Sequence, residues 1–464
     1  MTEATSTPPS ISTLGELKAA GYTYKTVREE LRDNLIAKLR AGEDPWPGLH
    51  GLEHTVLPQV ERAIIAGHDI VLLGERGQGK TRLLRTLPLL LDAYVPAVEG
   101  SELREHPLHP LTDATKRRIE EEGDATPIEW IPREARYSEK LATPDTSVAD
   151  LIGDVDPMRV AEGRRLGDPE TIHYGLIPRS NRGIVAINEL PDLAERIQVA
   201  MLNVMEEADI QIRGYMLRLP LDVVVVASAN PEDYTNRGRI ITPLKDRFGA
   251  EIRTHYPVEL DDEIRVIEQE SRLTAVVPQP IMEALARFTR ALRESDAVNQ
   301  RAGVSARFAI AGAETVAASA ARRAAVTGED PVARLVDLEA AVDVLGGKVE
   351  FEHGEEGREW DILEYLLRNA VAQSLRHRIK GLDFAPLIEA LDGSTFITTG
   401  ENITAAEFLD GLPQLEGTLY SDIATAFGAT SEGERAAAIE LAVEALYLTQ
   451  KISKDSGEGE TIYG

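Results

Sequence analysis

The chain has 464 residues, more than one compact domain usually holds, and its apolar fraction of 43% and charged fraction of 28% are those of a globular protein. It contains no cysteine, which excludes disulfide bonds, cysteine-ligated zinc, iron–sulfur clusters and thiol catalysis. A net charge of −28 repels nucleic acid and anionic membrane surfaces, so we expect neither as a partner. No stretch approaches the roughly 18 apolar residues of a membrane span, and we expect a soluble, cytoplasmic protein.

The N-terminal segment is predicted to be a tail and a helix that precede the first domain. Residues 1–12 are rich in Ser, Thr and Pro, which favours disorder, and they lack the basic and apolar regions of a signal peptide. Residues 13–42 carry apolar side chains at helical spacing, among them Val27, Leu31 and Leu35. A Pro- and Gly-rich stretch then ends this pattern, so we expect a separate N-terminal region over residues 1–43.

Strand and helix patterns alternate in the next two hundred or so residues. Short apolar runs lie at 70–73, 183–188 and 223–227, and helical patterns lie at 54–66 and 81–91. Such alternation predicts a parallel sheet with helices on both faces. We therefore expect an α/β nucleotide-binding core over residues 44–257, interrupted by a polar, Pro-rich surface insertion at about 100–145.

Helical patterns dominate the rest of the chain. Ala-rich apolar spacing, notably at 281–292 and 309–326, predicts an all-helical lid domain over residues 258–380. Residues 381–464 are predicted to be a further small helical region with Gly-rich punctuation. The expected fold class is therefore α/β, with a P-loop core followed by a helical lid and a small helical C-terminal region.

Residues 71–81 fit a buried strand, a loop of the form G-x-x-x-x-G-K-T and the start of a helix. The glycines let the backbone curl so that its N–H groups point at phosphate oxygens, and the helix adds its N-terminal dipole. Lys80 would reach the β- and γ-phosphates, and the Thr81 hydroxyl would ligate Mg²⁺. The alternative is a Gly-rich turn without a ligand. The pattern predicts an ATP site formed by Gly74, Gly77, Gln78, Gly79, Lys80 and Thr81.

A loop that hydrolyses ATP also needs polar groups at the end of a neighbouring strand, one for the metal and one for the attacking water. The run Ile-Val-Ala-Ile-Asn-Glu at 184–189 is the candidate. Glu189 stands where a carboxylate would polarise water, and Asn188 stands at the metal position in place of an aspartate. Because an amide brings no charge, we expect ATP binding to persist while Mg²⁺ affinity or turnover is weaker. The alternative is a core strand that ends in an exposed glutamate.

Three further polar residues stand where such a site uses them. Asn230 follows the run at 223–227 and can orient the attacking water, although Asn-Pro is also a common turn. Arg247 lies just past the α/β core, from which an arginine can reach the γ-phosphate of a neighbouring subunit; its alternative is a surface ion pair. Arg307 opens a helix of the second domain and could lean over the nucleotide. Between these positions, residues 210–219 alternate around a glycine and predict a β-hairpin.

Taken together, these segments resemble the AAA+ ATPases of the magnesium-chelatase I-subunit type, related to the MoxR group. The resemblance covers about residues 46–345, and its most specific part is the motif spread over 173–184. Residues 150–156 resemble the stretch before the family's helix-2 insert, whereas Asn188 departs from its Walker B aspartate. By resemblance, Leu49, His50 and Gly51 belong to the adenine-contacting lead-in, residues 210–219 to the pre-sensor hairpin, Asn230 to sensor 1, Arg247 to the arginine finger and Arg307 to sensor 2.

The resemblance implies a ring, usually of six subunits, with ATP and Mg²⁺ at the subunit interfaces. It also implies a partner with a von Willebrand A domain. Residues 392–396 of this chain fail the D-x-S-x-S motif at its last position, so that partner would be a separate protein. The predicted catalytic residues are Glu189, Asn230, Arg247 and Arg307, and the predicted metal ligands are Thr81 and Asn188.

Four functions remain open at this point. The leading one is a chaperone-like ATPase that remodels a partner protein. The second is the ATPase subunit of a true magnesium chelatase in chlorophyll-type pigment synthesis, which Asn188 and the unmatched residues 381–464 disfavour. The third is an AAA+ transcription activator, although the sequence has no GAFTGA loop. The fourth is a slow, ATP-gated scaffold, for which Asn188→Asp should raise turnover.

Overall fold

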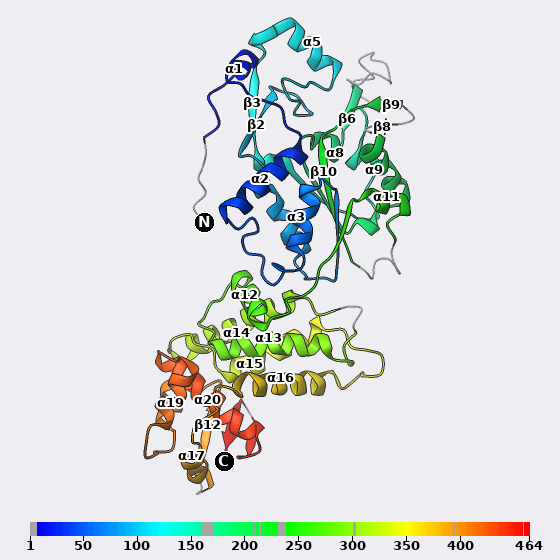
Figure 1. Cartoon of the computed structure of the whole chain (residues 1–464). Helices are drawn as coiled ribbons and strands as arrows, with labels where there is room; N and C mark the ends of the chain where they lie inside the picture. The colour runs from blue at the N-terminus through cyan, green and yellow to red at the C-terminus, as the bar shows by residue number, and fades with distance from the viewer. Residues whose placement is uncertain are drawn as a thin grey trace. The chain divides into compact units, whose positions relative to one another are not determined.

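The chain divides into two compact units, Met1–His255 and Tyr256–Gly464, which we take in turn (Figure 1). The structure is a computed structural model. It describes residues 7–156, 158, 171–207, 209–212, 215–230, 238–299, 303–392, 395–457 and 459–464.

A five-stranded parallel sheet forms the centre of the first unit. Its strands stand in the order β11-β1-β10-β7-β4, so strands distant in the sequence are neighbours. The bounds are Ala250–Arg253 for β11, Ile70–Leu73 for β1, Val223–Ala229 for β10, Gly183–Asn188 for β7 and Tyr137–Leu141 for β4. The three strands expected from the sequence are confirmed as β1, β7 and β10, whereas β4 and β11 were not predicted.

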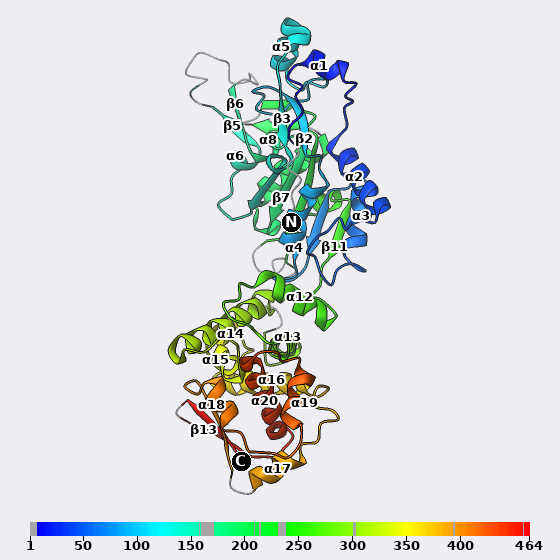
Figure 2. The same cartoon turned by 90° about the vertical axis from the view of Figure 1, so that its left-hand side faces the viewer.

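Both faces of this sheet are buried, because successive side chains of a strand point to opposite faces. On β7, Val185 and Ile187 join one apolar core, and Ile184 and Ala186 join another. Figures 1 and 2 show helices on either side of the sheet. The first core includes α6 Val148–Leu151, α8 Leu176–Arg179, α9 Glu195–Glu207 and α11 Thr242–Arg247, and the second includes α2 Val27–Ala41, α3 Leu57–Ile65 and α4 Lys80–Thr86. The predicted α/β class with helices on both faces is confirmed.

The polar stretch at 100–145 is only partly a surface insertion. Its residues 137–141 form β4, which pairs with β7 in the central sheet, so the prediction is wrong for this part. The remainder contains α5, Asp113–Glu122, and β3, Ile128–Pro132, which pairs antiparallel with β2, Tyr94–Val98. A short strand with polar side chains does not show the apolar run by which β1, β7 and β10 were recognised.

The N-terminal residues pack on this part of the unit. The backbone N–H of Ile128 donates to the carbonyl of Ser12 over 2.9 Å, and the indole N–H of Trp130 donates to the carbonyl of Ile11 over 2.8 Å. The disorder predicted for residues 1–12 is therefore wrong for residues 11 and 12. The helix expected over 13–42 is divided into α1, Leu14–Ala19, and α2.

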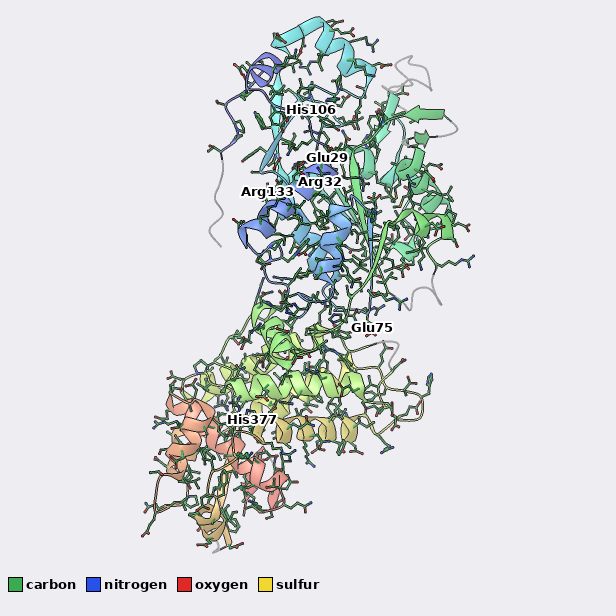
Figure 3. The ribbon with its side chains drawn as sticks, viewed as in Figure 1. Glu29, Arg32, Glu75, His106, Arg133 and His377 are labelled. Atoms are coloured by element: carbon green, nitrogen blue, oxygen red, sulfur yellow. The ribbon has the colours of Figure 1, made fainter. Side chains whose placement is uncertain are left out.

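Aromatic rings join the segment between α1 and α2 to the insertion. The ring of His106, labelled in Figure 3, lies 5.9 Å from that of Tyr22 and 5.0 Å from that of Tyr24. Burial lowers the pKa of His106 to about 3, so the ring is neutral at physiological pH. Its Nδ1 accepts from the backbone N–H of Leu108 over 3.0 Å. The cluster packs the segment between α1 and α2 against the insertion.

A buried ion pair holds α2 against the residue that precedes β4. Arg136 donates to both carboxylate oxygens of Glu30, over 2.7 and 2.6 Å, and both side chains are buried. Arg136 also donates to the carbonyl of Arg182, next to the start of β7, over 2.8 Å. A buried charge is tolerated only when it is paired in this way. The pair therefore fixes where β4 begins beside β7.

Two small antiparallel pairs complete the first unit. Strand β5, Gly153–Val155, pairs with β6, Ile172–Tyr174. Strand β8, Asp209–Ile212, pairs with β9, Tyr215–Arg218, which confirms the predicted hairpin.

The second unit is mainly helical and has one continuous apolar core. The helical patterns predicted at 281–292 and 309–326 are confirmed within α13 and α14. The helices of its first part are α12 Leu260–Glu270, α13 Gln279–Glu294, α14 Ala306–Thr327, α15 Leu335–Leu345 and α16 Glu359–Leu375. Of the helices in the described part of the chain, none has the length and apolar character needed to cross a membrane.

The C-terminal part of this unit contains the predicted helices and also a small sheet that was not predicted. Strands β12, β14 and β13 lie in that order and pair antiparallel. Their bounds are Ile397–Gly400, Glu460–Tyr463 and Lys454–Gly457, and the helices are α17 Ala385–Asp392, α18 Ala405–Asp410, α19 Leu419–Phe427 and α20 Glu432–Leu448. Helix α20 is buried over residues 436–446.

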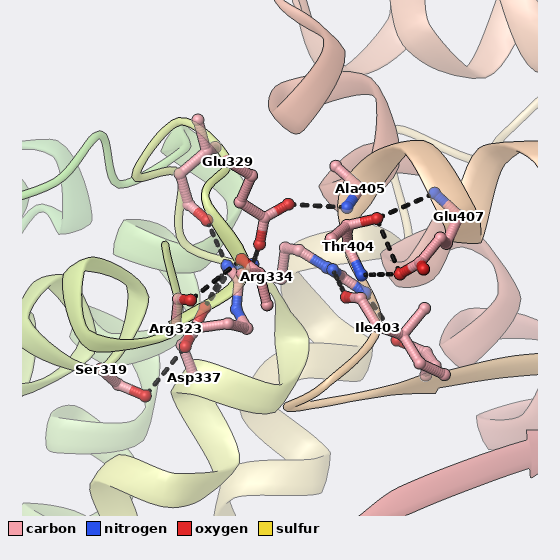
Figure 4. A network of polar contacts seen from close by, with 12 residues as sticks. Ser319, Arg323, Glu329, Arg334, Asp337, Ile403, Thr404, Ala405 and Glu407 are labelled. Carbon is pink, nitrogen blue, oxygen red and sulfur yellow. Dashed lines mark hydrogen bonds and ion pairs between the residues drawn. The ribbon is translucent and has the colours of Figure 1, made fainter. Parts of the chain in front are cut away.

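Polar contacts join the two parts of the second unit (Figure 4). Arg334, which is fully buried, pairs with Glu440 of α20 and donates to the hydroxyl of Thr399 on β12 over 2.9 Å. Asp337 accepts from the backbone N–H of Arg334 over 2.9 Å and from Arg323 over 3.0 Å. Residues 381–464 therefore share both a core and a buried polar network with the helices before them.

Candidate functional site

The loop after β1 has the backbone that a phosphate cradle needs. Gly77 and Gly79 have φ values of +80° and +75°, a region that side chains other than glycine rarely adopt. A Cβ added to Gly74 would lie 1.9 Å from the hydroxyl oxygen of Thr254, so this position also requires glycine. Helix α4 begins at Lys80, and its continuation from Leu87 to Leu90 is a 3₁₀ turn that contains Pro88. The predicted order of strand, loop and helix is thus present.

Two side chains of the loop turn inward. The ammonium of Lys80 is buried and donates to the carbonyl of Glu75 over 2.7 Å and to the side-chain oxygen of Asn230 over 2.8 Å. The amide oxygen of Gln78 accepts from the backbone N–H of Glu75 over 3.0 Å and from the hydroxyl of Thr254 over 2.9 Å. The backbone of Glu75, which is labelled in Figure 3, thus takes part in the contacts of both side chains. These contacts tie the loop to the ends of β10 and β11.

A cavity of about 350 Å³ opens beside this loop. Its size is within the range of small-molecule sites. It lies at the carboxyl ends of β1 and β11, the edge at which open α/β sheets bind ligands. The lining residues are Leu73, Gly74, Glu75, Gln78, Lys245, Glu251, Arg253 and Thr254.

The end of β7 meets the ends of β10 and the loop. Glu189 has a left-handed backbone, φ 56° and ψ 46°, and its carboxylate accepts from the side-chain amide of Asn230 over 2.9 Å. Asn188 is buried, and its side-chain oxygen accepts from the hydroxyl of Ser228 over 3.0 Å. Because β1, β10 and β7 are adjacent, four predicted residues come together: Lys80, Asn188, Glu189 and Asn230.

Glu139 is a member of this group that the sequence analysis missed. Its carboxylate accepts from the side-chain N–H₂ of Asn188 over 2.7 Å and from Arg85 of α4 over 2.8 and 3.0 Å. The Arg85 guanidinium holds the pKa of Glu139 below its ordinary value, so the carboxylate is ionised at neutral pH. The sequence offered no signal for Glu139, because β4 itself was not predicted. Ser228 and Thr254 were also missed, although both lie at strand ends that could have been searched.

The predicted lead-in lies against the start of α4. The carbonyl of Gly48 accepts from the guanidinium of Arg82 over 3.0 Å. Leu49 is buried, and Gly51 has a φ of +76°. This contact brings Leu49, His50 and Gly51 to the helix that follows the loop.

In the described part of the first unit, Arg247 is not part of the hydrogen-bonded group around Lys80, and Arg307 belongs to the second unit. Arg247 is 41% exposed, lies 3.7 Å from Glu206 and donates to the carbonyl of Met205 over 3.3 Å, contacts that fit the alternative of a surface ion pair. Arg307 opens α14 in the second unit, where its backbone N–H donates to the hydroxyl of Ser305 over 3.1 Å. Both roles stay predictions.

The oxygen atoms at this site are those that Mg²⁺ prefers. Thr81 offers a hydroxyl, Asn188 an amide oxygen and Glu139 a carboxylate, all hard ligands. In the described part of the chain, no three acidic or histidine side chains are grouped as a complete metal cage. Such a set of ligands suits a Mg²⁺ ion that takes its remaining ligands from phosphates and water.

Comparison of the sequence with known proteins finds similar proteins. No family model matches the chain. The magnesium-chelatase 38 kDa subunit of Cereibacter sphaeroides is 27% identical over 236 residues, which are 48% of this chain and 62% of that subunit. The chain is similar to the magnesium-chelatase 38 kDa subunits, and it spans less than two thirds of the length of those that it matches. The resemblance to the magnesium-chelatase I-subunit type that the motifs indicated is therefore confirmed.

Two further proteins are similar to this chain. The acetoin dehydrogenase operon transcriptional activator AcoR of Bacillus subtilis is 25% identical over 215 residues, 46% of this chain and 28% of the activator. A structure of the complex between subunits BchI and BchD of magnesium chelatase matches 70% of this chain and 98% of the matched chain, with 21% identity and a TM-score of 0.33.

Proposed function

We propose that this chain binds ATP with Mg²⁺ on the loop Gly74–Thr81, hydrolyses it, and uses the cycle to remodel a partner protein. The observation that carries the proposal is the hydrogen-bonded line from Lys80 through Asn230 to Glu189. It joins a buried ammonium to a carboxylate, and other residues of the loop that carries the ammonium line a cavity of about 350 Å³. A cation for phosphate and a base for water thus stand within two hydrogen bonds of each other.

The contacts of Lys80, Asn188, Glu189 and Asn230 support a role for each of them, and Thr81 and the glycines follow from the loop pattern. The ammonium of Lys80 would leave the loop carbonyls for the β- and γ-phosphates, and Gly74, Gly77, Gln78 and Gly79 would offer backbone N–H groups. Thr81 and Asn188 would hold Mg²⁺, which supplies charge stabilisation at the transferred phosphate. Glu189 would polarise the attacking water, and Asn230 would hold its carboxylate in place. The cavity and the lead-in of Leu49, His50 and Gly51 would receive the nucleoside.

The test of this function is phosphate release from ATP by the pure protein at several protein concentrations. We expect Mg²⁺-dependent turnover that rises with protein concentration, because a site shared between subunits forms by mass action. A rate equal to that of the Lys80→Ala variant at every concentration would overturn hydrolysis.

We further propose a ring, with six subunits as the expected number, in which Arg247 completes the site of its neighbour. Its half-exposed side chain and weak pairing with Glu206 leave it available for an exchange of partners. Arg307 would complete the site from its own lid. The partner would be a separate protein with a von Willebrand A domain, and nucleic acid and membrane would not be bound because of the net charge of −28.

Mixing two inactive variants tests the shared site. Lys80→Ala lacks its own loop but keeps the arginine, and Arg247→Ala keeps the loop but lacks the arginine. In a ring assembled at random from equal amounts, we expect about a quarter of the sites to regain activity, since each needs one subunit of each kind in the right order. The measurement is phosphate release from the mixture against each variant alone. Activity no greater than the mean of the two variants excludes Arg247 as a group acting between subunits.

A true magnesium-chelatase subunit is the second candidate. The identity to the Cereibacter sphaeroides subunit favours it, although the match covers 48% of this chain. Neighbouring genes for porphyrin synthesis would support it, whereas a gene for a von Willebrand A protein alone would support the remodelling ATPase. The transcription activator, suggested by the match to AcoR, predicts a gel shift on DNA at low salt, which the acidic charge opposes.

A further inference from the structure

The side chains of Asn188 and Glu139 form one hydrogen-bonded pair at the edge of the site. Strand register explains the contact. Glu139 pairs with Ala186, and Leu141 pairs with Asn188, so all four side chains lie on the same face of the sheet, two residues apart along each strand. The longer glutamate then reaches along this face to the amide of Asn188, over 2.7 Å.

This face of the sheet is the one that α4 covers. Arg85 of α4 donates to the carboxylate of Glu139. Thr81 lies one helical turn before Arg85, on the same side of the helix. Asn188 and Glu139 therefore lie on the side of β7 and β4 that the predicted metal residue Thr81 faces. Glu139 is 22% exposed, so ions and water have access to its carboxylate.

The contact explains why position 188 is an amide. An ionised carboxylate has no hydrogen to donate, so an aspartate at 188 would face the carboxylate of Glu139 at hydrogen-bonding distance without a proton between them. Two carboxylates in such a position cannot both stay ionised without a cation. The N–H₂ of Asn188 removes this conflict, and its oxygen, turned to Ser228, keeps a second lone pair.

We propose that Glu139 supplies the negative charge toward Mg²⁺ that Asn188 lacks, so that the work of one aspartate is divided between two side chains of adjacent strands. Asn188 offers the hard oxygen, and Glu139 offers the charge. The inference rests on the proposed binding of Mg²⁺ and ATP. On this view Asn188 does not slow ATP hydrolysis, and the Asn188→Asp substitution alone does not raise the rate of hydrolysis.

Arg85 is the counter-ion of Glu139 when no metal is bound. Its side chain is 63% exposed, and an exposed ion pair contributes only about 0–1 kcal/mol. Arg85 can therefore yield to a divalent cation at little cost. Removing the charge of Arg85 should therefore increase the affinity of the Glu139 carboxylate for Mg²⁺.

The test exchanges the positions of the carboxylate and the amide. We would prepare Glu139→Gln, Asn188→Asp and the double variant, and titrate Mg²⁺ into each with a fluorescent, non-hydrolysable ATP analogue. The readout is the Mg²⁺ concentration that gives half of the metal-dependent change in analogue affinity. Glu134→Gln is the matched control, because it removes an exposed charge from the turn just before β4.

We expect Glu139→Gln to need about tenfold more Mg²⁺, a usual effect for a residue behind a metal ligand, while binding the analogue normally in EDTA. The double variant, with its carboxylate at 188, should return close to the wild-type value, and Asn188→Asp alone should lower the melting temperature. Arg85→Gln, which leaves Glu139 unchanged, should lower the Mg²⁺ requirement, and it keeps the test valid if Glu139→Gln folds poorly.

An unchanged Mg²⁺ titration in Glu139→Gln, or a double variant no better than Glu139→Gln, overturns the inference and leaves the proposed function standing. An unchanged or raised Mg²⁺ requirement in Arg85→Gln overturns it as well. If the wild-type protein binds the analogue no better than Lys80→Ala in EDTA and in Mg²⁺, the proposed function fails and the inference with it.

Discussion

Lys80→Ala is expected to lower the affinity for ATP by about a hundredfold or more, which corresponds to roughly 2.7 kcal/mol. The ammonium of Lys80 is buried between the carbonyl of Glu75 and the side chain of Asn230, so its charge acts where water screens it little. Polyphosphate would exchange these neutral partners for charged ones. The measurement is the equilibrium affinity for a fluorescent ATP analogue in the presence of Mg²⁺.

The control for this variant is Lys18→Ala, which removes a lysine that is 51% exposed and paired with Asp124. It should bind the analogue like the wild-type protein. Since Lys80→Ala also leaves loop carbonyls without their donor, its melting temperature should be recorded, and Lys80→Met tests the charge while it keeps the aliphatic stem. An affinity within about threefold of wild type in both Lys80 variants contradicts a phosphate-binding role.

Glu189→Gln is expected to keep ATP binding and to lower the rate of hydrolysis by about a hundred- to ten-thousandfold, the usual range for a general base. Glutamine keeps the length of the side chain and can still accept from Asn230, so the left-handed backbone at this position should be retained. It cannot take a proton from water. The variant should hold unhydrolysed ATP, which can be measured as the nucleotide that remains bound after gel filtration.

Glu195→Gln provides the comparison, because Glu195 is an exposed residue in the first turn of α9. Its rate should stay within about twofold of the wild-type rate, as for most surface substitutions. Hydrolysis by Glu189→Gln within about tenfold of wild type would mean that another group activates the water. Loss of ATP binding would instead point to a structural role for the Glu189–Asn230 contact.

The loop Gly74–Thr81 and much of the sheet beside it could be predicted from the amino-acid sequence alone. The loop is local: a buried strand, glycines at the positions of positive φ and the start of a helix are all contained in residues 70–86. Strands β1, β7 and β10 are buried on both faces and therefore appear as continuous apolar runs. Once these strands are predicted, Glu189 and Asn230 can be predicted as site residues, because polar residues at the carboxyl ends of adjacent parallel strands meet at one edge of the sheet.

Only the tertiary structure placed what lies outside this pattern. Strand β4 reads Tyr-Ser-Glu-Lys-Leu and β11 reads Ala-Glu-Ile-Arg, neither of which is an apolar run, because both are edge strands with half-exposed side chains. The contact of Glu139 with Asn188 joins residues 49 positions apart and depends on strand order and register. Periodicity along a chain reports which face of an element is buried, but it carries no information about which strand becomes the neighbour. For that reason the sequence could identify Asn188 as a missing charge, and only the folded sheet could show a carboxylate beside it.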